Sequence, residues 1–289
     1  DTITTGSGND RIDTGDGASL IVTTGGDNVI TTGSGEDTIT VGGGNDIILA
    51  GSGANTITGL GGNKYILGGA GADTITLTDG KNLIVTGDGA STIVATHGDN
   101  VVCTGSNVDT ITLGDGKNLV STGDGANTVI TGNGQNIVWG GDGVDTITVG
   151  NGGNYIDGRE GPANTIISGS GNDTVISGGG ADTITTDGGD DLILVKGGAD
   201  VISAGTGFDK LVVDYSGVSA GITNAISGGT VAAGYTGTLA GNGSATFSGV
   251  ETFDITTGTG DDNITGGDGD DIIDTGTGDD DVFAGGGSD

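Results

Sequence analysis

The chain has 289 residues, of which 68 are glycine, with one proline, one cysteine, one tryptophan and no methionine. Because a glycine inside a helix costs roughly 0.5–1 kcal/mol relative to alanine, this composition excludes a helical protein, and the single proline excludes collagen. The 39 acidic residues outnumber 7 Lys and Arg residues and give a formal net charge of −32. Nucleic acid and anionic membrane surfaces are therefore not expected as partners, whereas cations are.

Three further features limit the class of protein. No apolar run approaches the roughly 20 residues of a membrane span, and no signal-peptide pattern is present, so we expect no membrane insertion. The lone Cys103 cannot form an intrachain disulfide, and we expect it to act as a small apolar residue. The chain starts at Asp1 rather than at methionine, which is typical of a processed or excised segment.

The tetrapeptide Asp-Thr-Ile-Thr recurs along the chain at a nearly constant spacing. The first four intervals between its copies are 36 residues and the last is 37. The extra residue falls in Arg159–Asn164, the only segment that contains a proline. A fixed period of this length is the mark of a repeat architecture. The six copies begin at Asp1, Asp37, Asp73, Asp109, Asp145 and Asp182.

Each block of 36 residues divides into four units of nine, the first of which is Thr2–Asp10. Twenty-three units run to Asp209 and four more occupy residues 254–289, and the second residue of all 27 is Ile or Val. A disordered chain has no reason to phase its apolar residues in this way, so the pattern argues against disorder.

Within a unit, three strand-forming residues precede a glycine-rich hexad, as in Thr2–Thr4 followed by Thr5–Asp10. Alternation along the strand sends the central Ile inward and its two neighbours outward. The hexad then turns the chain, with glycine at positions that need positive φ. Two units therefore make one coil, which consists of a strand, a turn, a return strand and a second turn. Parallel stacking of such coils predicts an all-β protein, a parallel β-roll or β-helix solenoid of nonapeptide repeats.

The repeat divides the chain into three parts. Residues 1–209 and 254–289 are expected to form β-roll segments, and residues 210–253, which break the period, a small antiparallel β insertion. Its expected strands are Leu211–Tyr215, Thr230–Ala233 and Ala245–Phe247, separated by Gly/Ser turns. Our interpretation of the insertion is a flap that covers the roll, and a binding module is the alternative.

The hexad and the strand after it resemble the nonapeptide of the repeats-in-toxin (RTX) calcium-binding family, G-G-x-G-x-D-x-U-x, where U is a large apolar residue. Gly178–Ile184 and Gly266–Ile273 are two of the matches, and the resemblance covers residues 1–209 and 254–289. It implies a parallel β-roll, several calcium ions in the turns, and one-step secretion from a Gram-negative bacterium to the cell surface or beyond. The family's usual C-terminal secretion signal is not visible.

Calcium takes about six to eight oxygen ligands, and the hexad suits it because glycine lets successive carbonyls converge while the sixth residue adds a carboxylate. The resemblance places each site between turns stacked on the same side, which are two units apart in the chain. We expect the best sites where Asp follows Asp at this spacing. For Asp37, Asp73, Asp109 and Asp145, the alternative that the carboxylate only solvates its turn stays open. The candidate ligands are Asp173, Asp182, Asp191, Asp200, Asp209, Asp262, Asp271, Asp280, Asp289, Asp10, Asp46, Asp37, Asp73, Asp109 and Asp145.

The sixth hexad position is not always acidic. From Asn82 to Asn154 we expect stacked amides to form a hydrogen-bonded ladder in place of metal, the alternative being weak calcium sites. Lys64 is expected to exclude calcium locally, because an ammonium only donates hydrogen bonds and repels the cation. The full set of replacements is Asn28, Asn55, Asn82, Asn100, Asn118, Asn127, Asn136, Asn154, Asn164, Ser19, Ser91 and Lys64.

The outward strand positions differ between the two faces of the predicted roll. One face carries Thr-x-Thr segments such as Thr38–Thr40 and Thr74–Thr76, and the other carries apolar segments such as Ile47–Leu49 and Leu83–Val85. The threonine rows resemble those of antifreeze solenoids, although threonine is also a good strand former. A contiguous exposed apolar face usually marks an interface.

These features favour a structural protein and not an enzyme. His97 is the only histidine and stands in a predicted turn, so catalytic triads and zinc sites are not expected. We predict an extracellular calcium-binding structural protein: a filament, surface layer, biofilm matrix or adhesin stalk that folds on binding calcium and self-associates, head to tail and laterally. The alternatives are a calcium-dependent secretion and folding module of a larger exported enzyme and, as a minor one, an ice-binding solenoid.

Overall fold

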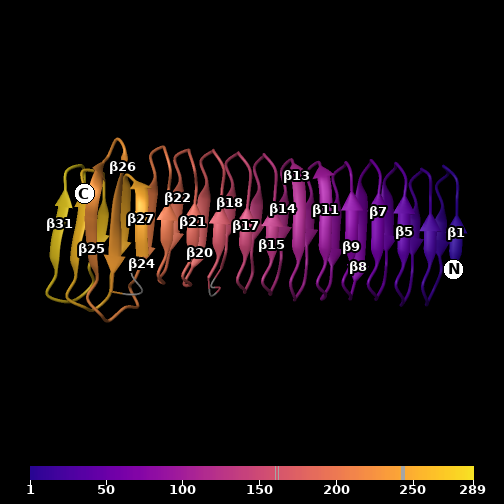
Figure 1. Ribbon diagram of the computed structural model, residues 1–289, viewed down its shortest axis with the longest axis horizontal. Helices are drawn as coiled ribbons and strands as arrows, with labels where there is room; N and C mark the ends of the chain where they lie inside the picture. The colour runs from indigo at the N-terminus through magenta and orange to yellow at the C-terminus, as the bar shows by residue number, and fades with distance from the viewer. Residues whose placement is uncertain (160, 162, 242–244) are drawn as a thin grey trace. The chain divides into compact units, whose positions relative to one another are not determined.

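The computed structural model describes residues 1–159, 161, 163–241 and 245–289. The chain forms two compact units, Asp1–Gly141 (unit 1) and Asp142–Asp289 (unit 2). Each unit is a parallel β-solenoid with about 18 residues per turn, which confirms the predicted fold class (Figure 1). Two members of the proline-bearing segment, Glu160 and Pro162, lie outside the described residues.

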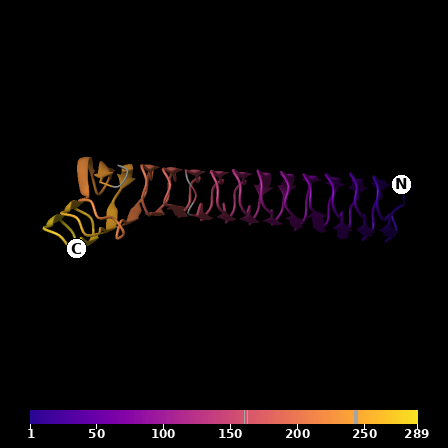
Figure 2. The same cartoon turned by 90° about the horizontal axis from the view of Figure 1, so that it is seen from below.

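In unit 1 the odd-numbered strands form one parallel sheet and the even-numbered strands form another. The register is constant, so that Thr2 pairs with Leu20 and Ile3 with Ile21. In Figure 2 the two strands of a coil in this unit lie on opposite sides of the coil. The first sheet contains β1 (Thr2–Thr4), β3 (Leu20–Val22), β5 (Thr38–Val41), β7 (Thr56–Gly59), β9 (Thr74–Leu77), β11 (Thr92–His97), β13 (Thr110–Asp115) and β15 (Thr128–Ile130). The second contains β2 (Arg11–Asp13), β4 (Val29–Thr31), β6 (Asp46–Leu49), β8 (Lys64–Gly69), β10 (Leu83–Thr86), β12 (Val101–Cys103), β14 (Leu119–Ser121) and β16 (Ile137–Trp139).

In most of the described nine-residue units three positions point inward, where the sequence pattern predicts only one. Around β5, Asp37, Ile39 and Val41 are 1%, 0% and 0% exposed, whereas Thr38 between them is exposed. The alternation of the strand therefore continues for one residue beyond each end of the three-residue segment. As a result, the first hexad residue joins the core wherever it is apolar, and the sixth hexad residue lies inside the coil.

Glycine is required where stacked turns touch. Gly53 has a φ of 128°, and a Cβ atom on it would lie 1.9 Å from the carbonyl oxygen of Gly35, one coil earlier. Only a residue without a side chain allows this approach, and only glycine adopts this φ without strain. The turns therefore stack at backbone distance, which brings the carbonyl oxygens of consecutive coils together.

Unit 2 contains one adjustment of the repeat spacing. Thr146 pairs with Thr165 and Tyr155 with Thr174, one residue more than the usual spacing, and the pairing of Thr165 with Thr183 restores it. The strands of the first sheet are β17 (Thr146–Thr148), β19 (Thr165–Ile167), β21 (Thr183–Thr185), β23 (Val201–Ser203), β27 (Ala245–Val250), β26 (Gly234–Ala240), β25 (Thr223–Thr230), β29 (Asn263–Gly267) and β31 (Asp281–Gly285). Those of the second are β18 (Tyr155–Asp157), β20 (Thr174–Gly178), β22 (Leu192–Val195), β24 (Lys210–Asp214), β28 (Thr252–Thr256) and β30 (Ile272–Asp274).

The predicted antiparallel segment is present, but it lies in a sheet and does not cover the roll. β26 pairs antiparallel with both β25 and β27, β27 pairs parallel with β23, and β25 pairs parallel with β29. The predicted strand at Thr230–Ala233 is wrong, because its last three residues form the turn between β25 and β26. Threonine and valine favour strands, yet the antiparallel return of the chain requires a turn at this point.

The strands at both ends of the predicted insertion belong to the solenoid. β24 pairs in parallel with β22 and β28, and Leu211 takes the central inward position beside Ile193 and Phe253. Phe247 likewise pairs with Ile202. The rings of Phe247 and Phe253 meet edge to face with centroids 5.1 Å apart, so aromatic residues fill the core beside the antiparallel strands.

Candidate calcium sites between stacked turns

The sixth-position carboxylates of unit 2 are held by the backbone of the preceding coil. The Asp173 N–H donates to Asp191 Oδ1 at 2.8 Å, and the Asp191 N–H donates to Asp209 Oδ1 at 2.9 Å. On the other side of the coils, the Asp182 N–H donates to Asp200 Oδ1 at 2.8 Å. We call this column of sixth-position side chains the inner ladder. It fixes the orientation of each carboxylate because one of its two oxygens is always engaged.

At most of these residues the second carboxylate oxygen, Oδ2, is buried and accepts no hydrogen bond of normal geometry. A buried acceptor without a partner costs roughly 1–3 kcal/mol, and more when it is charged, so these atoms need a positive partner or a proton. The residues of the inner ladder whose Oδ2 is buried and accepts no hydrogen bond include Asp10, Asp37, Asp73, Asp109, Asp173, Asp182, Asp191, Asp200, Asp209 and Asp271.

The titration of these groups reflects the same burial. Loss of solvent raises the pKa of Asp200 and Asp209 to about 7 and that of Asp191 to about 6. Backbone N–H groups, and the Thr186 side chain at Asp191, act in the opposite direction. Carboxylates in neighbouring coils raise these pKa values further, Asp182 for Asp200 and Asp191 for Asp209. Burial also raises the pKa of Asp271 to about 6. A bound cation would favour the charged form of each of these carboxyls.

The asparagine coils show which groups surround the side-chain atom Nδ2, which occupies the place of Oδ2 in an Asp coil. Asn118 Nδ2 donates to the carbonyl oxygens of Gly114 and Gly116 at 3.1 and 3.3 Å. Asn154 Nδ2 donates to Gly150 and Gly152 at 3.0 and 2.7 Å. In an Asp coil this atom is an oxygen, and the turn carbonyls near it are also acceptors. Carboxylate and carbonyl oxygens are the ligands that calcium takes, so the chemistry of this arrangement suits the ion.

The predicted asparagine ladder is confirmed in unit 1. Asn82 Nδ2 donates to Asn100 Oδ1 at 2.8 Å, Asn100 Nδ2 to Asn118 Oδ1 at 3.1 Å, and Asn118 Nδ2 to Asn136 Oδ1 at 3.0 Å. Each amide thus donates both to its own turn and to the next coil, and its oxygen accepts from the preceding one. The ladder supplies donors at the place where the Asp coils lack them.

The isolated acidic positions take part in the same ladder but lack carboxylate neighbours. The Ser19, Asn55 and Ser91 N–H groups donate to Asp37, Asp73 and Asp109 at 2.7, 2.9 and 2.8 Å. Asp145 is buried and donates its own N–H to Asn164 Oδ1 at 2.8 Å. Asp10 also donates its N–H to an asparagine oxygen, Asn28 Oδ1, at 3.0 Å. Calcium at these positions stays a prediction.

The C-terminal repeats bring together the predicted pairs. The Asp262 N–H donates to Asp280 Oδ1 at 2.9 Å, and the Asp271 N–H donates to Asp289 Oδ1 at 3.0 Å. At Asp262 the hydroxyl group of Thr257, the first residue of the hexad, donates to Oδ2 at 2.5 Å. The Thr186 hydroxyl, at the same position before Asp191, also lowers the pKa of that carboxyl, although burial outweighs it.

One ladder residue was not foreseen from the sequence. Glu251 is 3% exposed, and its Oε2 accepts the Asp209 N–H at 2.7 Å, which is the role of the next sixth-position Asp. It was missed because the non-repeating residues shift it out of the regular two-unit spacing. Its place before the apolar Phe253, like that of Asp191 before Ile193, is the signal that points to it.

A second, outer ladder was also missed. The Asn45, Asn63 and Lys81 N–H groups donate to Oδ1 of Asp27, Asn45 and Asn63 at 2.7, 3.2 and 2.8 Å. These side chains are the fifth residues of their hexads, and they are exposed. The recurrence of Asp or Asn at this position in alternate units, at residues 9, 27, 45, 63, 99, 172 and 190, was available in the sequence as a signal. The outer ladder ties successive turns together independently of the inner one.

The remaining candidate groups do not gather into another centre. In the described part of the chain, no three His, Cys, Asp or Glu side chains lie close enough to hold a metal between them. A cation in these turns must therefore take most of its ligands from backbone carbonyls. His97 is exposed, with its Nδ1 3.3 Å from Asp79 Oδ1, and Cys103 is half-buried and forms no disulfide.

The sequence was compared with known families. Its repeats match the RTX calcium-binding nonapeptide repeat over residues 1–161, 163–193, 196–212 and 256–289. The chain belongs to the RTX calcium-binding repeat family. Neither a search of curated proteins nor a search of solved structures found a match. Within the described residues, no helix is long and apolar enough to cross a membrane.

Proposed function

We propose that this RTX β-roll is a non-enzymatic, calcium-binding structural segment of an extracellular protein: a filament, surface layer, biofilm matrix or adhesin stalk. RTX repeats typically bind calcium and imply secretion, typically by the type I route of Gram-negative bacteria. In this proposal the acidic coils of unit 2 fold on binding calcium, and the whole segment then self-associates.

The observation that carries the proposal is the asparagine ladder of unit 1. Along the column Asn82, Asn100, Asn118 and Asn136 the inner ladder is closed by amides, while the strands keep their parallel register. A module whose task is calcium-triggered folding needs only acidic turns. Coils that stack through their own side chains add length and stiffness, which are the properties of a structural element.

The second sheet of unit 1 supports lateral association. Its outward residues form a continuous apolar row, and Ile47, Tyr65 and Ile137 in that row are 42%, 39% and 38% exposed. An exposed apolar strip of this kind usually marks an interaction site. The residues of the row are Ile47, Tyr65, Leu83, Val101, Leu119 and Ile137, each in register with the next.

Electron microscopy and light scattering of the purified chain, in millimolar calcium and in chelator, test the assembly. Filaments or bundles that form in calcium and dissolve in chelator are the expected result. Particles that remain monomeric in calcium at every protein concentration contradict the proposed assembly. Tyr65→Glu, which places a charge in the apolar row, should reduce bundling, whereas Thr74→Glu on the other sheet is the matched control.

The competing function is a secretion and folding module of a larger exported enzyme. It shares the calcium sites with the structural proposal, so calcium titration does not separate the two. The domain composition of the full-length gene product separates them. A catalytic domain in the same polypeptide, with activity that requires the calcium-bound roll, would replace the structural proposal.

An ice-binding role is a minor alternative that rests on the threonine rows. Thr38, Thr56, Thr74, Thr92 and Thr110 stand in register on adjacent strands of the first sheet. The parallel row that begins Thr40, Thr58, Thr76 is interrupted by Val94, which disfavours this function. A thermal-hysteresis measurement on the calcium-loaded chain tests it.

A further inference from the structure

Lys64 is a buried lysine at a position that elsewhere holds Asp, Asn or Ser. It occupies the sixth place of its hexad, at the start of strand β8, and is 2% exposed. Lysine is almost never fully buried unless its charge is paired. The contacts of its ammonium group therefore indicate what this turn requires.

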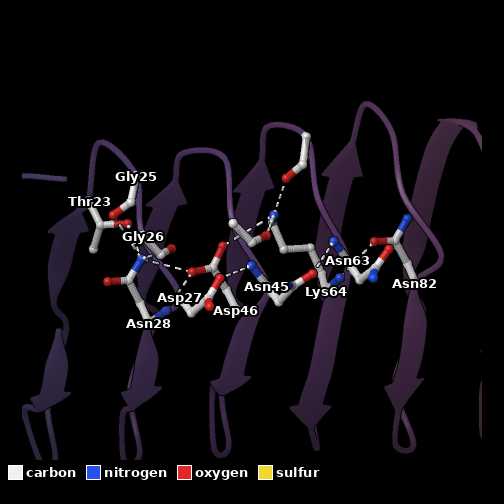
Figure 3. Close-up of polar contacts among 12 residues, drawn as sticks. Thr23, Gly25, Gly26, Asp27, Asn28, Asn45, Asp46, Asn63, Lys64 and Asn82 are labelled. Carbon is white, nitrogen blue, oxygen red and sulfur yellow. Dashed lines mark hydrogen bonds and ion pairs between the residues drawn. The ribbon is translucent and has the colours of Figure 1, made fainter. Parts of the chain in front are cut away.

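The ammonium group lies among oxygen atoms of two stacked turns. Lys64 Nζ donates to the carbonyl oxygen of Gly44 at 2.8 Å and to the carbonyl oxygen of Gly61. It also lies 3.2 Å from Oδ2 of Asp46, and both side chains of this ion pair are at most 1% exposed. Figure 3 shows the row formed by Asn28, Asp46, Lys64 and Asn82.

The residues around Lys64 leave room for the aliphatic part of its side chain. A Cβ atom on Gly59 would lie 3.0 Å from Lys64 Cε, so the glycine at the first hexad position allows the side chain to fold back over its own turn. The inner ladder adapts as well. The Lys64 N–H donates to Asn82 Oδ1 at 3.0 Å, whereas the Asp46 N–H, which finds no acceptor on a lysine, donates to the Asn63 carbonyl at 3.1 Å.

The three partners of the ammonium are ligands of the kind that calcium takes, two carbonyl oxygens and one carboxylate oxygen. They come from two consecutive turns on the same side of the coils. In unit 2, Oδ2 of the corresponding carboxylates Asp191 and Asp209 is buried and accepts no hydrogen bond of normal geometry. At Asp46 that oxygen is paired, because Lys64 supplies the positive charge.

We propose that Lys64 is a built-in cation that occupies the calcium position between the 41–46 and 59–64 turns, and that removing its ammonium opens a calcium site on Asp46, Gly44 and Gly61. This inference rests on the proposed calcium function. It goes beyond simple exclusion of the metal: the lysine replaces the ion, so this coil stays folded when calcium is withdrawn. A chelator cannot remove a cation that is covalently part of the chain.

Hydrogen exchange of residues 41–67, together with a count of bound calcium by native mass spectrometry, tests the proposal in the full chain. In the native chain, protection of this segment should be the same in calcium and in chelator. Lys64→Ala should lower its protection in chelator on the order of a hundredfold, because Asp46 is left buried and unpaired. Calcium should restore the protection and add one ion per chain.

Three further variants separate a calcium site from a loss of packing. Lys64→Asp, which carries the usual sixth-position residue, should also gain one ion. Lys64→Ala combined with Asp46→Asn should gain none. Lys81→Ala removes an exposed lysine that pairs with Asp99 at 3.1 Å, and it should behave like the native chain.

The proposal is overturned if calcium fails to restore the hydrogen-exchange protection of residues 41–67 in both Lys64→Ala and Lys64→Asp. It is also overturned if this segment loses its protection in chelator in the native chain. The response of residues 165–213 in the same experiment reports separately on the proposed calcium function. If the protection of residues 165–213 does not change with calcium while that of residues 41–67 in Lys64→Ala does, the proposed function fails and the role of Lys64 stands.

Discussion

Asn118 in unit 1 and Asp191 in unit 2 occupy the same place in a coil and differ in one group of atoms. Both side chains accept a backbone N–H from the preceding coil through Oδ1. The second atom of Asn118 donates to its turn and to Asn136, whereas the second oxygen of Asp191 is buried without a donor. The fold is the same, but only the asparagine coil satisfies its own polar groups.

The comparison shows how one solenoid holds two kinds of coil. Where amides or an ammonium fill the inner ladder, the chain provides its own donors. Where consecutive carboxylates fill it, the folded state needs a cation or protons from solution, because buried charges without partners are costly. The sixth hexad residue therefore sets the dependence of each coil on calcium without changing its backbone.

Chelation should produce the largest difference between the two regions. Residues 165–213 are expected to lose most of their hydrogen-exchange protection in chelator, while residues 82–138 keep theirs. A single ion at about 100 times its Kd stabilises the folded state by about 2.7 kcal/mol, and several ions act on the acidic coils together. Equal protection of the two regions in chelator would contradict the comparison.

Exchanging the side chains of Asn118 and Asp191 should also exchange the calcium dependence of the stability of the two coils. Without calcium, Asn118→Asp should destabilise unit 1 by about 1–3 kcal/mol, because it buries an acceptor without a partner. Asp191→Asn should stabilise metal-free unit 2 by a similar amount and remove calcium ligation at that turn. Urea unfolding measures both changes, with Trp139 fluorescence reporting unit 1. A loss of stability on Asp191→Asn in chelator is the outcome that excludes this explanation.

The pH dependence of the metal-free chain should be opposite to that of an ordinary ion-paired Asp. Burial raises the pKa of Asp200 and Asp209 to about 7 from the usual 3.8, so the folded state binds protons more tightly than the unfolded state. This contribution to stability is present below about pH 4 and is lost as pH rises through about 7.

Metal-free unit 2 should therefore be more stable at acidic than at alkaline pH, whereas calcium affinity should rise with pH across the same range. The strands that follow Asn100, Asn118 and Asn136 serve as the internal control, because the amides in this column of the inner ladder do not titrate. Urea midpoints in chelator at a series of pH values measure the effect. A midpoint in unit 2 that rises with pH in the absence of metal would argue against desolvated carboxylates.

The outer ladder should show the smallest effect and no difference between the units. Asn45 and Asn172 each accept one backbone N–H from the next coil, at 3.2 and 3.0 Å. Asn45→Ala and Asn172→Ala should each cost about 0.5–1.5 kcal/mol, since one ordinary hydrogen bond is lost. Both losses should be the same in calcium and in chelator. A calcium-dependent loss at Asn172 alone would mean that the outer ladder also takes part in the site.

Much of the solenoid could be predicted because its interactions repeat. The central Ile or Val of each unit, the parallel register and the asparagine ladder all follow from a two-unit spacing that is visible in the sequence. Where the spacing breaks, prediction failed in two ways. Thr230–Ala233 has strand-forming residues but lies at a turn, and Glu251 acts as a ladder carboxylate outside the repeat.

The sequence by itself determined the nonapeptide repeat, the family and the positions at which a carboxylate gives way to an amide or a lysine. Only the tertiary structure decided what those side chains do. The sixth hexad residue points into the coil, so Asp191 is desolvated and Lys64 meets Gly44, Gly61 and Asp46. The reason is that strand alternation and the stacking of turns at backbone distance place each of these groups among atoms from another coil, and no local pattern specifies that environment.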